Sequence, residues 1–112
     1  FDSLVIGFYQ GKELHYAARV RAGFVPATRR VVFEQIKGLK TSKCPFVNLP
    51  EKQAGRWGQG LTAEKMKDCV WLIPEAVARF DFLEWTSADH LRHTKFVAMR
   101  DDKDPRKVVR ET

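Results

Sequence analysis

The sequence predicts a mainly β domain in which about five antiparallel strands surround a single core, with one main helix inserted after the early strands. Strict period-two alternation in residues 14–22, helical spacing of apolar residues in 26–37, and short apolar runs after Cys69 support this fold. By pattern alone the count is typical of an OB-like barrel, and a small SH3-like barrel or an α+β sandwich fits nearly as well.

Length and charge restrict the class of protein. At 112 residues the chain fits one domain, and its net charge of +6 and pI near 9.6 favour a polyanionic partner. Residues 1–50 hold eight Lys and Arg against three acids, whereas residues 51–112 hold twelve against eleven. We therefore expect any nucleic-acid face to draw mainly on the first half, although moderately basic globular domains are also common.

The soft side chains do not predict a metal site or a disulfide. Cys44 and Cys69 are the two cysteines, without Cys-x-x-Cys spacing, and only three histidines accompany them.

No apolar run approaches the roughly 18 residues of a membrane span, and no leader pattern opens the chain. We expect a cytoplasmic protein that binds no membrane. Because the chain begins at Phe1 without a methionine, we also expect it to be a piece of a longer one.

The first two strands form the expected opening hairpin. Leu4, Ile6 and Phe8 alternate with other residues, residues 10–12 turn the chain, and residues 14, 16, 18, 20 and 22 form one apolar face. Arg19 and Arg21 then lie on the open face, where they are candidates to follow a DNA backbone. A solvated outer face is an equal alternative, because Glu13 lies there too.

A helix is expected from about Pro26 to Lys37, with Pro26 in the first turn and a stop signal at Gly38. Val25 has no side-chain acceptor for the first turn. Arg29 and Arg30 make the exposed side basic. They are interpreted first as solubilising charges and second as DNA contacts.

Residues 40–69 predict a long loop with a short helix, because Pro and Gly interrupt any longer element. Thr62 is placed to cap that helix. Trp57 in this loop is a candidate to stack on a base or sugar, and packing back onto the domain is its alternative.

The pattern of the second half of the sequence predicts the remaining strands. Residues 70–73 form a compact apolar run that we interpret as a buried strand, and the next run changes phase near Leu83, which predicts a β-bulge. Thr86 to Asp89 form a turn, and the final strand leads to Arg100. Residues 104–112 are expected to leave the barrel as a charged tail.

The final strand ends in two cations that bracket two carboxylates, Arg100-Asp101-Asp102-Lys103. The planar guanidinium of Arg100 and the compact ammonium of Lys103 together suit a polyphosphate. The alternative is a solvated charged turn.

Phe96-x-x-x-Arg100-x-Asp102-Lys103, preceded by Leu91-Arg92-His93, resembles the last nucleotidyltransferase motif of ATP-dependent DNA ligases. The same order of features continues through most of the chain, in Gly7-x-Tyr9, Arg19-Val20, Gly23-Phe24 and Trp71-x-x-Pro74-Glu75. This resembles the C-terminal domain of bacterial ligases, including those of non-homologous end joining. The resemblance selects the OB-fold, a five-stranded antiparallel barrel over residues 1–112.

The resemblance also implies a function in DNA repair. The whole enzyme would use ATP and Mg²⁺, neither tightly bound to this domain, and would seal nicked double-stranded DNA together with the adenylation domain of the same chain. Arg100 and Lys103 would lie over the β- and γ-phosphates, and Asp102 would pair with a cation or touch metal. No Lys-x-Asp-Gly nucleophile motif occurs, so we expect the chain alone to be inactive, and monomeric.

Two alternatives remain. A free-standing module that binds single-stranded nucleic acid would need aromatic side chains on the open sheet face. A domain of a capping-type RNA nucleotidyltransferase shares the chemistry but fits the Leu91-Arg92-His93 run less well.

Overall fold

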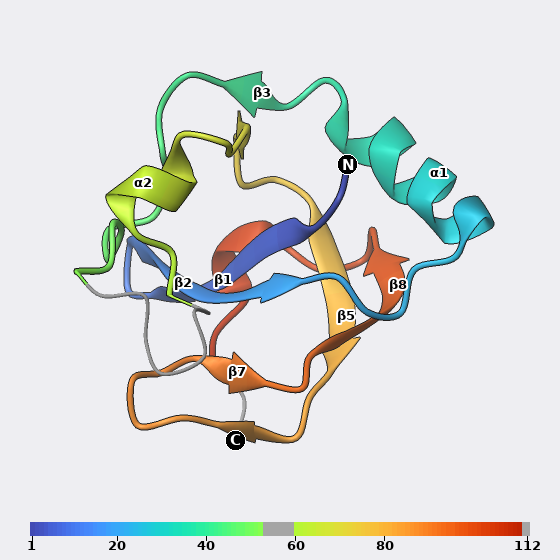
Figure 1. Cartoon of the computed structure of the whole chain (residues 1–112). Coiled ribbons are helices and arrows are strands. Elements are labelled where there is room, and N and C mark those ends of the chain that lie inside the picture. Colours follow the sequence, from blue (N-terminus) through green and yellow to red (C-terminus); the bar gives the residue numbers. More distant parts are fainter. Residues whose placement is uncertain (53–59, 111–112) are drawn as a thin grey trace.

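The computed structural model describes residues 1–52 and 60–110 (Figure 1). In chain order its strands are β1 (Leu4–Gln10), β2 (Glu13–Val20), β3 (Lys40–Thr41), β4 (Trp71–Leu72), β5 (Val77–Asp81), β6 (Glu84–Trp85), β7 (Leu91–Arg92) and β8 (Lys95–Arg100). The helices are α1 (Pro26–Ile36), α2 (Ala63–Met66) and the short 3-10 helix η1 (Pro105–Lys107). Strands dominate, as the sequence predicts, and the arrangement is consistent with an OB-fold.

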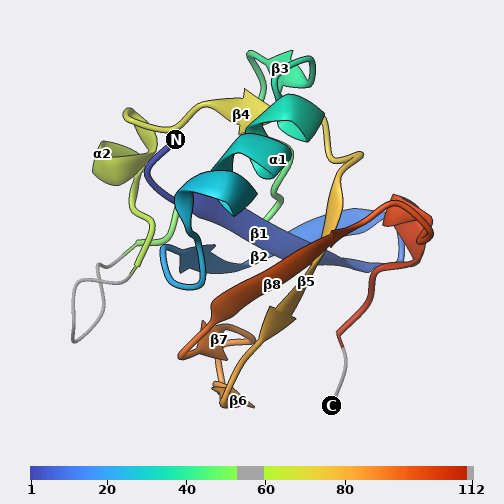
Figure 2. The same ribbon diagram turned by 90° about the vertical axis from the view of Figure 1, so that its right-hand side faces the viewer.

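Antiparallel pairing joins β1 to β2, β3 to β4, β5 to β8 and β6 to β7. The β1–β2 ribbon crosses the β5–β8 ribbon, and α1 lies above both in the view of Figure 2. A single bridge links Ala22, just after β2, to Lys95 of β8, and the Phe96 amide donates to the Ala22 carbonyl at 2.9 Å. The described residues therefore form two-stranded ladders rather than a closed five-stranded barrel, and that detail of the prediction is not confirmed.

Gly23 explains why β2 and β8 meet only briefly. Its φ is +93°, and a Cβ there would lie 2.4 Å from the Phe96 carbonyl oxygen. The chain therefore turns away from β8 at a residue that has a positive φ and touches the β8 backbone. Only glycine tolerates this combination. Continuous pairing ends at this point.

The core follows the alternation of β2. Tyr16, Ala18 and Val20 are buried, together with Phe8 of β1 and Phe96 of β8. Ala17 is buried as well, on the opposite face of β2. Both faces of this strand are therefore covered near its centre, which a simple inside–outside alternation does not predict.

The helix α1 begins and ends close to the predicted bounds, and Lys37 is its C-cap. Val25 indeed offers no side-chain acceptor for the first-turn amides, and the Thr28 hydroxyl instead accepts from the Val25 amide at 2.9 Å. Val32 is fully buried beneath the helix, whereas Phe33 is half exposed. The helix thus packs through a narrower apolar stripe than the sequence predicts.

The interpretation of residues 70–73 as a compact buried strand is wrong. Only Trp71 and Leu72 pair, with the two residues of β3, and Val70 and Ile73 are 63% and 44% exposed. The β3–β4 ladder has two strands of two residues each, so its flanking residues are covered only in part, although the Ile73 amide donates to the Leu39 carbonyl at 2.7 Å. By contrast, the predicted short helix forms, and the Thr62 hydroxyl accepts from the Lys65 amide at its start.

The bulge predicted near Leu83 does not form there, because β5 ends at Asp81 and the chain pairs again only in β6 from Glu84; a bulge lies instead in the β5–β8 ladder, with Val97 of β8 as the extra residue. The β5–β8 register shifts between Arg79 and Phe80, and the predicted final strand is interrupted at His93, where φ is +55°. Asp89 also has positive φ, in the predicted turn after β6.

Residues 104–110, expected to leave the barrel as a charged tail, instead pack against β1 and β6. The Tyr9 amide donates to the Val108 carbonyl at 2.7 Å, and the Arg110 guanidinium lies 4.9 Å from the Trp85 ring centre and pairs with Asp89. This contact places η1 beside β1, directly after the motif. In the part of the chain that the structure describes, no helix is long and apolar enough to cross a membrane.

Candidate phosphate-binding site

The predicted motif lies in the turn after β8. Arg100 is the last residue of β8 and pairs in register with Val77 at the start of β5. Residues 101–103 then turn the chain, and η1 follows, with the Asp104 carboxylate accepting from the Arg106 amide at 3.0 Å. The strand pair on one side and the capped η1 on the other hold the turn at both ends.

Arg100 and Asp102 form a bidentate ion pair. Arg100 Nε donates to Asp102 Oδ1 at 3.2 Å, and its Nη2 donates to Oδ2 at 2.9 Å. The hydrogen bonds from Arg100, followed by one from the backbone, lower the pKa of Asp102 below its ordinary value. Of the two roles open to Asp102 from the sequence, the structure contains the pairing with a cation. The pair orients the guanidinium while leaving its side chain 41% exposed.

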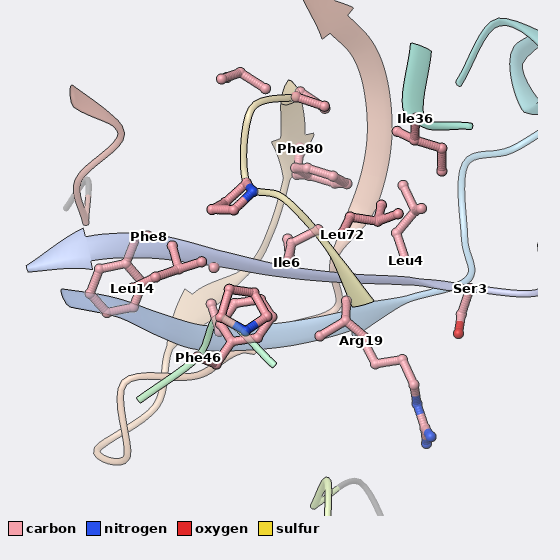
Figure 3. Close-up of a pocket in the computed structure, with 18 of the residues that line it drawn as sticks. Ser3, Leu4, Ile6, Phe8, Leu14, Arg19, Ile36, Phe46, Leu72 and Phe80 are labelled. Atoms are coloured by element: carbon pink, nitrogen blue, oxygen red, sulfur yellow. The ribbon is translucent and has the colours of Figure 1, made fainter. Parts of the chain in front are cut away.

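Arg100 and Lys103 line one side of a cavity of about 1120 Å³ that opens between the two crossing ribbons. Its interior is apolar, with Leu4, Ile6, Leu72 and Phe80 directed toward one another in Figure 3. Among the described residues that line the cavity, cations outnumber acids, because only Asp2 and Asp68 contribute carboxylates. The arrangement suits an anion held at the rim of an apolar hollow.

Arg19 and Arg21, two of the predicted DNA contacts, line the same cavity. Figure 3 shows the Arg19 guanidinium directed away from the apolar cluster. Arg21 is exposed and lies 3.4 Å from the Asp2 carboxylate. Arg19, Arg21 and Arg100 therefore line one cavity, as residues that contribute to one basic surface should. The role of Arg19 and Arg21 in DNA binding stays a prediction.

Arg29 and Arg30 lie elsewhere, on α1. Arg29 lies 5.2 Å from the ring centres of both Phe1 and Phe24, and its Nη1 donates to the Phe1 carbonyl at 2.8 Å. These contacts give Arg29 a structural role, because they attach the N-terminal segment to α1. Arg30 is exposed and remains a candidate for a DNA contact. Trp57, the predicted stacking residue, falls outside the described residues.

Sequence reasoning missed a polar cluster that joins three distant segments. His90 Nε2 lies 2.8 Å from Glu51 Oε2, while Glu51 Oε1 accepts from the Leu61 amide at 2.9 Å. The ring of Tyr16 packs edge-on to His90, with centroids 5.2 Å apart. Burial, and secondly the charge of Glu51, raise the pKa of Tyr16 to about 12. The cluster connects the long loop to the β2 core, and no sequence spacing would have revealed it.

No candidate metal centre accompanies the site. Within residues 1–52 and 60–110, no group of three or more His, Cys, Asp or Glu side chains is arranged to hold a metal ion. Cys44 and Cys69 are free thiols, each hydrogen-bonded to a backbone carbonyl. The donor groups of the site are cations, which fit phosphate oxygens and not a metal.

Comparison with known proteins is consistent with this geometry. The profile of the family described as ATP dependent DNA ligase C terminal region matches residues 1–103. The multifunctional non-homologous end joining DNA repair protein LigD of Mycobacterium tuberculosis is 33% identical over 97% of this chain. The corresponding protein of Pseudomonas aeruginosa is 25% identical over 97%. The chain spans only 13% and 12% of the lengths of these two relatives.

Two solved structures are similar to this chain over nearly its whole length. The ligase domain from M. tuberculosis LigD superposes with a TM-score of 0.81 at 30% identity, covering 98% of this chain and 32% of that one. A mycobacterial DNA ligase D complexed with ATP and MES superposes with a TM-score of 0.78 at 31% identity, covering 98% and 33%. The likeness extends over nearly the whole chain, and each relative carries much additional sequence.

Proposed function

Because this chain belongs to the family of ATP-dependent DNA ligase C-terminal regions, we propose that it serves the ligase reaction in two ways. It orients the triphosphate of ATP while the enzyme is adenylated, and it later holds nicked duplex DNA. The catalytic lysine would come from an adenylation domain elsewhere in the full-length chain, since no Lys-x-Asp-Gly occurs here. The chain alone should therefore be inactive in sealing.

The observation that supports the first role is the Arg100–Asp102 pair with Lys103 beside it at the rim of the cavity. Asp102 holds the Arg100 fork in one orientation before any anion arrives, which reduces the cost of ordering it. A guanidinium and an ammonium at the terminal phosphates would draw negative charge toward the departing pyrophosphate. The protein contributes position and charge to this step, and no covalent chemistry.

The side chains of this site suit the phosphates of ATP better than the Mg²⁺ that accompanies ATP. Asp102 already accepts two hydrogen bonds from Arg100, and in the described ranges it belongs to no group of three or more side chains arranged to hold a metal ion. A metal ion bound to the triphosphate would supply charge neutralisation during transfer. Its protein ligands, in this proposal, belong to the rest of the enzyme.

The second role is supported by the cations that share the cavity lining. Arg19 and Arg21 extend from the end of β2, and the first fifty residues carry most of the positive excess. Contacts of this type attract the phosphate backbone of DNA without reading its sequence. A single-stranded module is less well supported, because Tyr16 is buried and Phe80 faces the cavity interior, so neither offers an open stacking surface.

The two nucleic-acid functions differ in the form of DNA that they prefer. Fluorescence anisotropy of the 112-residue chain should show tighter binding to a nicked duplex than to a single strand of the same sequence. An Arg19→Gln variant should weaken duplex binding, whereas Lys67→Gln, which removes one exposed charge near α2, serves as the matched control. Preference for the single strand would reject the ligase role in favour of the alternative.

A further inference from the structure

Arg79 of β5 lies outside the motif but shares a face with Arg100. In the β5–β8 ladder Val77 is opposite Arg100, and Arg79 is opposite Ala98. Opposed side chains of an antiparallel pair point to the same face, as do residues two apart on one strand. Arg79 and Arg100 are therefore diagonal neighbours on one face, at the roughly 7–8 Å typical of that relation.

Arg79 also belongs to the lining of the cavity. It shares this lining with Arg100 and Lys103, and it is exposed. Asp102, which holds Arg100, is not part of the lining, so the three cations present positive charge to the hollow.

Among the described residues, Arg79 has no carboxylate partner of the kind that Arg100 has in Asp102. None of the ion pairs found in residues 1–52 and 60–110 involves Arg79. Arg79 therefore brings to this face a positive charge that is not shared with a carboxylate of the described residues, whereas Arg100 shares its charge with Asp102.

We propose that Arg79 is a third phosphate-binding residue of this site, completing with Arg100 and Lys103 a pocket for the terminal phosphates of a triphosphate or for free pyrophosphate. The inference rests on the proposed role of Arg100 and Lys103 and adds a residue from a different strand. Arg79 brings a second planar fork, which suits two adjacent phosphate groups better than a single phosphate.

The probe is inorganic pyrophosphate, added to the 112-residue chain and followed by backbone amide shifts in NMR, which detect weak binding. The variants are Arg79→Gln, Arg79→Lys and Arg100→Gln. Lys67→Gln removes the same charge beside α2, at an exposed residue that is not part of the cavity lining. Because exposed charge contacts contribute modestly, we expect Arg79→Gln to weaken pyrophosphate binding about threefold to tenfold. Arg79→Lys should lose less, and Lys67→Gln should bind like the unmodified chain.

The outcomes separate this inference from the proposed function. If Arg100→Gln weakens binding and Arg79→Gln does not, the role of Arg79 is rejected while that of Arg100 stands. If pyrophosphate causes no saturable shifts in β5 or β8, both are rejected. Nicked duplex titrated in parallel distinguishes the two phosphate sources: a loss for DNA without a loss for pyrophosphate would make Arg79 a DNA contact and overturn the inference. Unchanged amide spectra before ligand addition verify that each variant is folded.

Discussion

Replacing Arg100 by Ala in the full-length ligase should slow enzyme adenylation far more than sealing of DNA that is already adenylated. The proposed partner of Arg100 is the pyrophosphate of ATP, which has left once AMP is on the DNA. Only the first step should therefore lose a contact. The fold should persist, because Arg100 is the last residue of β8 and its side chain is partly exposed.

The structure limits the size of the effect. A hydrogen bond to a charged group contributes about 1.5–3 kcal/mol. Arg100 is 41% exposed and already donates twice to Asp102, so a phosphate must share the guanidinium with that carboxylate. Solvent screening and this sharing reduce the net contribution to about 1–2 kcal/mol, which corresponds to roughly fivefold to thirtyfold in rate.

The assay compares single-turnover self-adenylation with sealing of a pre-adenylated nick, for the parent enzyme and for Arg100→Ala, Lys103→Ala and the control Lys67→Ala. Arg100→Lys should give an intermediate loss, because it keeps the charge and removes the fork. Equal losses in the two steps would refute the assignment to pyrophosphate. A loss for Lys67→Ala as large as for Arg100→Ala would show that the effect is net charge alone.

Three further results are expected. Gly23→Ala should lower the free energy of unfolding in urea by more than about 2 kcal/mol, since it combines positive φ with a clash on the Phe96 backbone. Gly11→Ala, with φ +64° and open space, should cost only about 1 kcal/mol, and equal costs would contradict the packing argument. Tyr16 ionises less readily when folded, so its contribution to stability is complete below pH 10 and should be lost as the pH rises toward 12. Denaturation of Tyr16→Phe should lack this part of the pH dependence; an identical profile would exclude Tyr16 as its source. Nicked-duplex affinity should fall steeply with salt, and Arg19→Gln should reduce the slope by about one, whereas salt-independent affinity would show that backbone phosphates are not the target.

The elements that sequence predicted well are those with strict alternation or a clear cap. The period-two pattern of β2 predicted its buried face, because each strand residue points opposite to the next. Residues 70–73 are all apolar, so their sequence has no alternation that would show which side chains are buried. Hydrophobicity alone suggested burial, and only the position of β4 in a two-residue edge ladder shows that Val70 and Ile73 remain exposed.

The motif from Arg100 to Lys103 was visible because its residues are contiguous, whereas Arg79 required knowledge of strand pairing. The alternation of Ala76, Ala78 and Phe80 already put Arg79 on the outward face, but not beside Arg100. That proximity depends on the β5–β8 register, which shifts only after Arg79. Val97 of β8 is the extra residue of this shift, so β5 continues without interruption and Arg79 stays on the face of Val77 and Arg100. Pairing displaced by one residue along the whole ladder would instead place Ala78 opposite Arg100 and turn Arg79 to the other face, so the register decides whether the two arginines share a face.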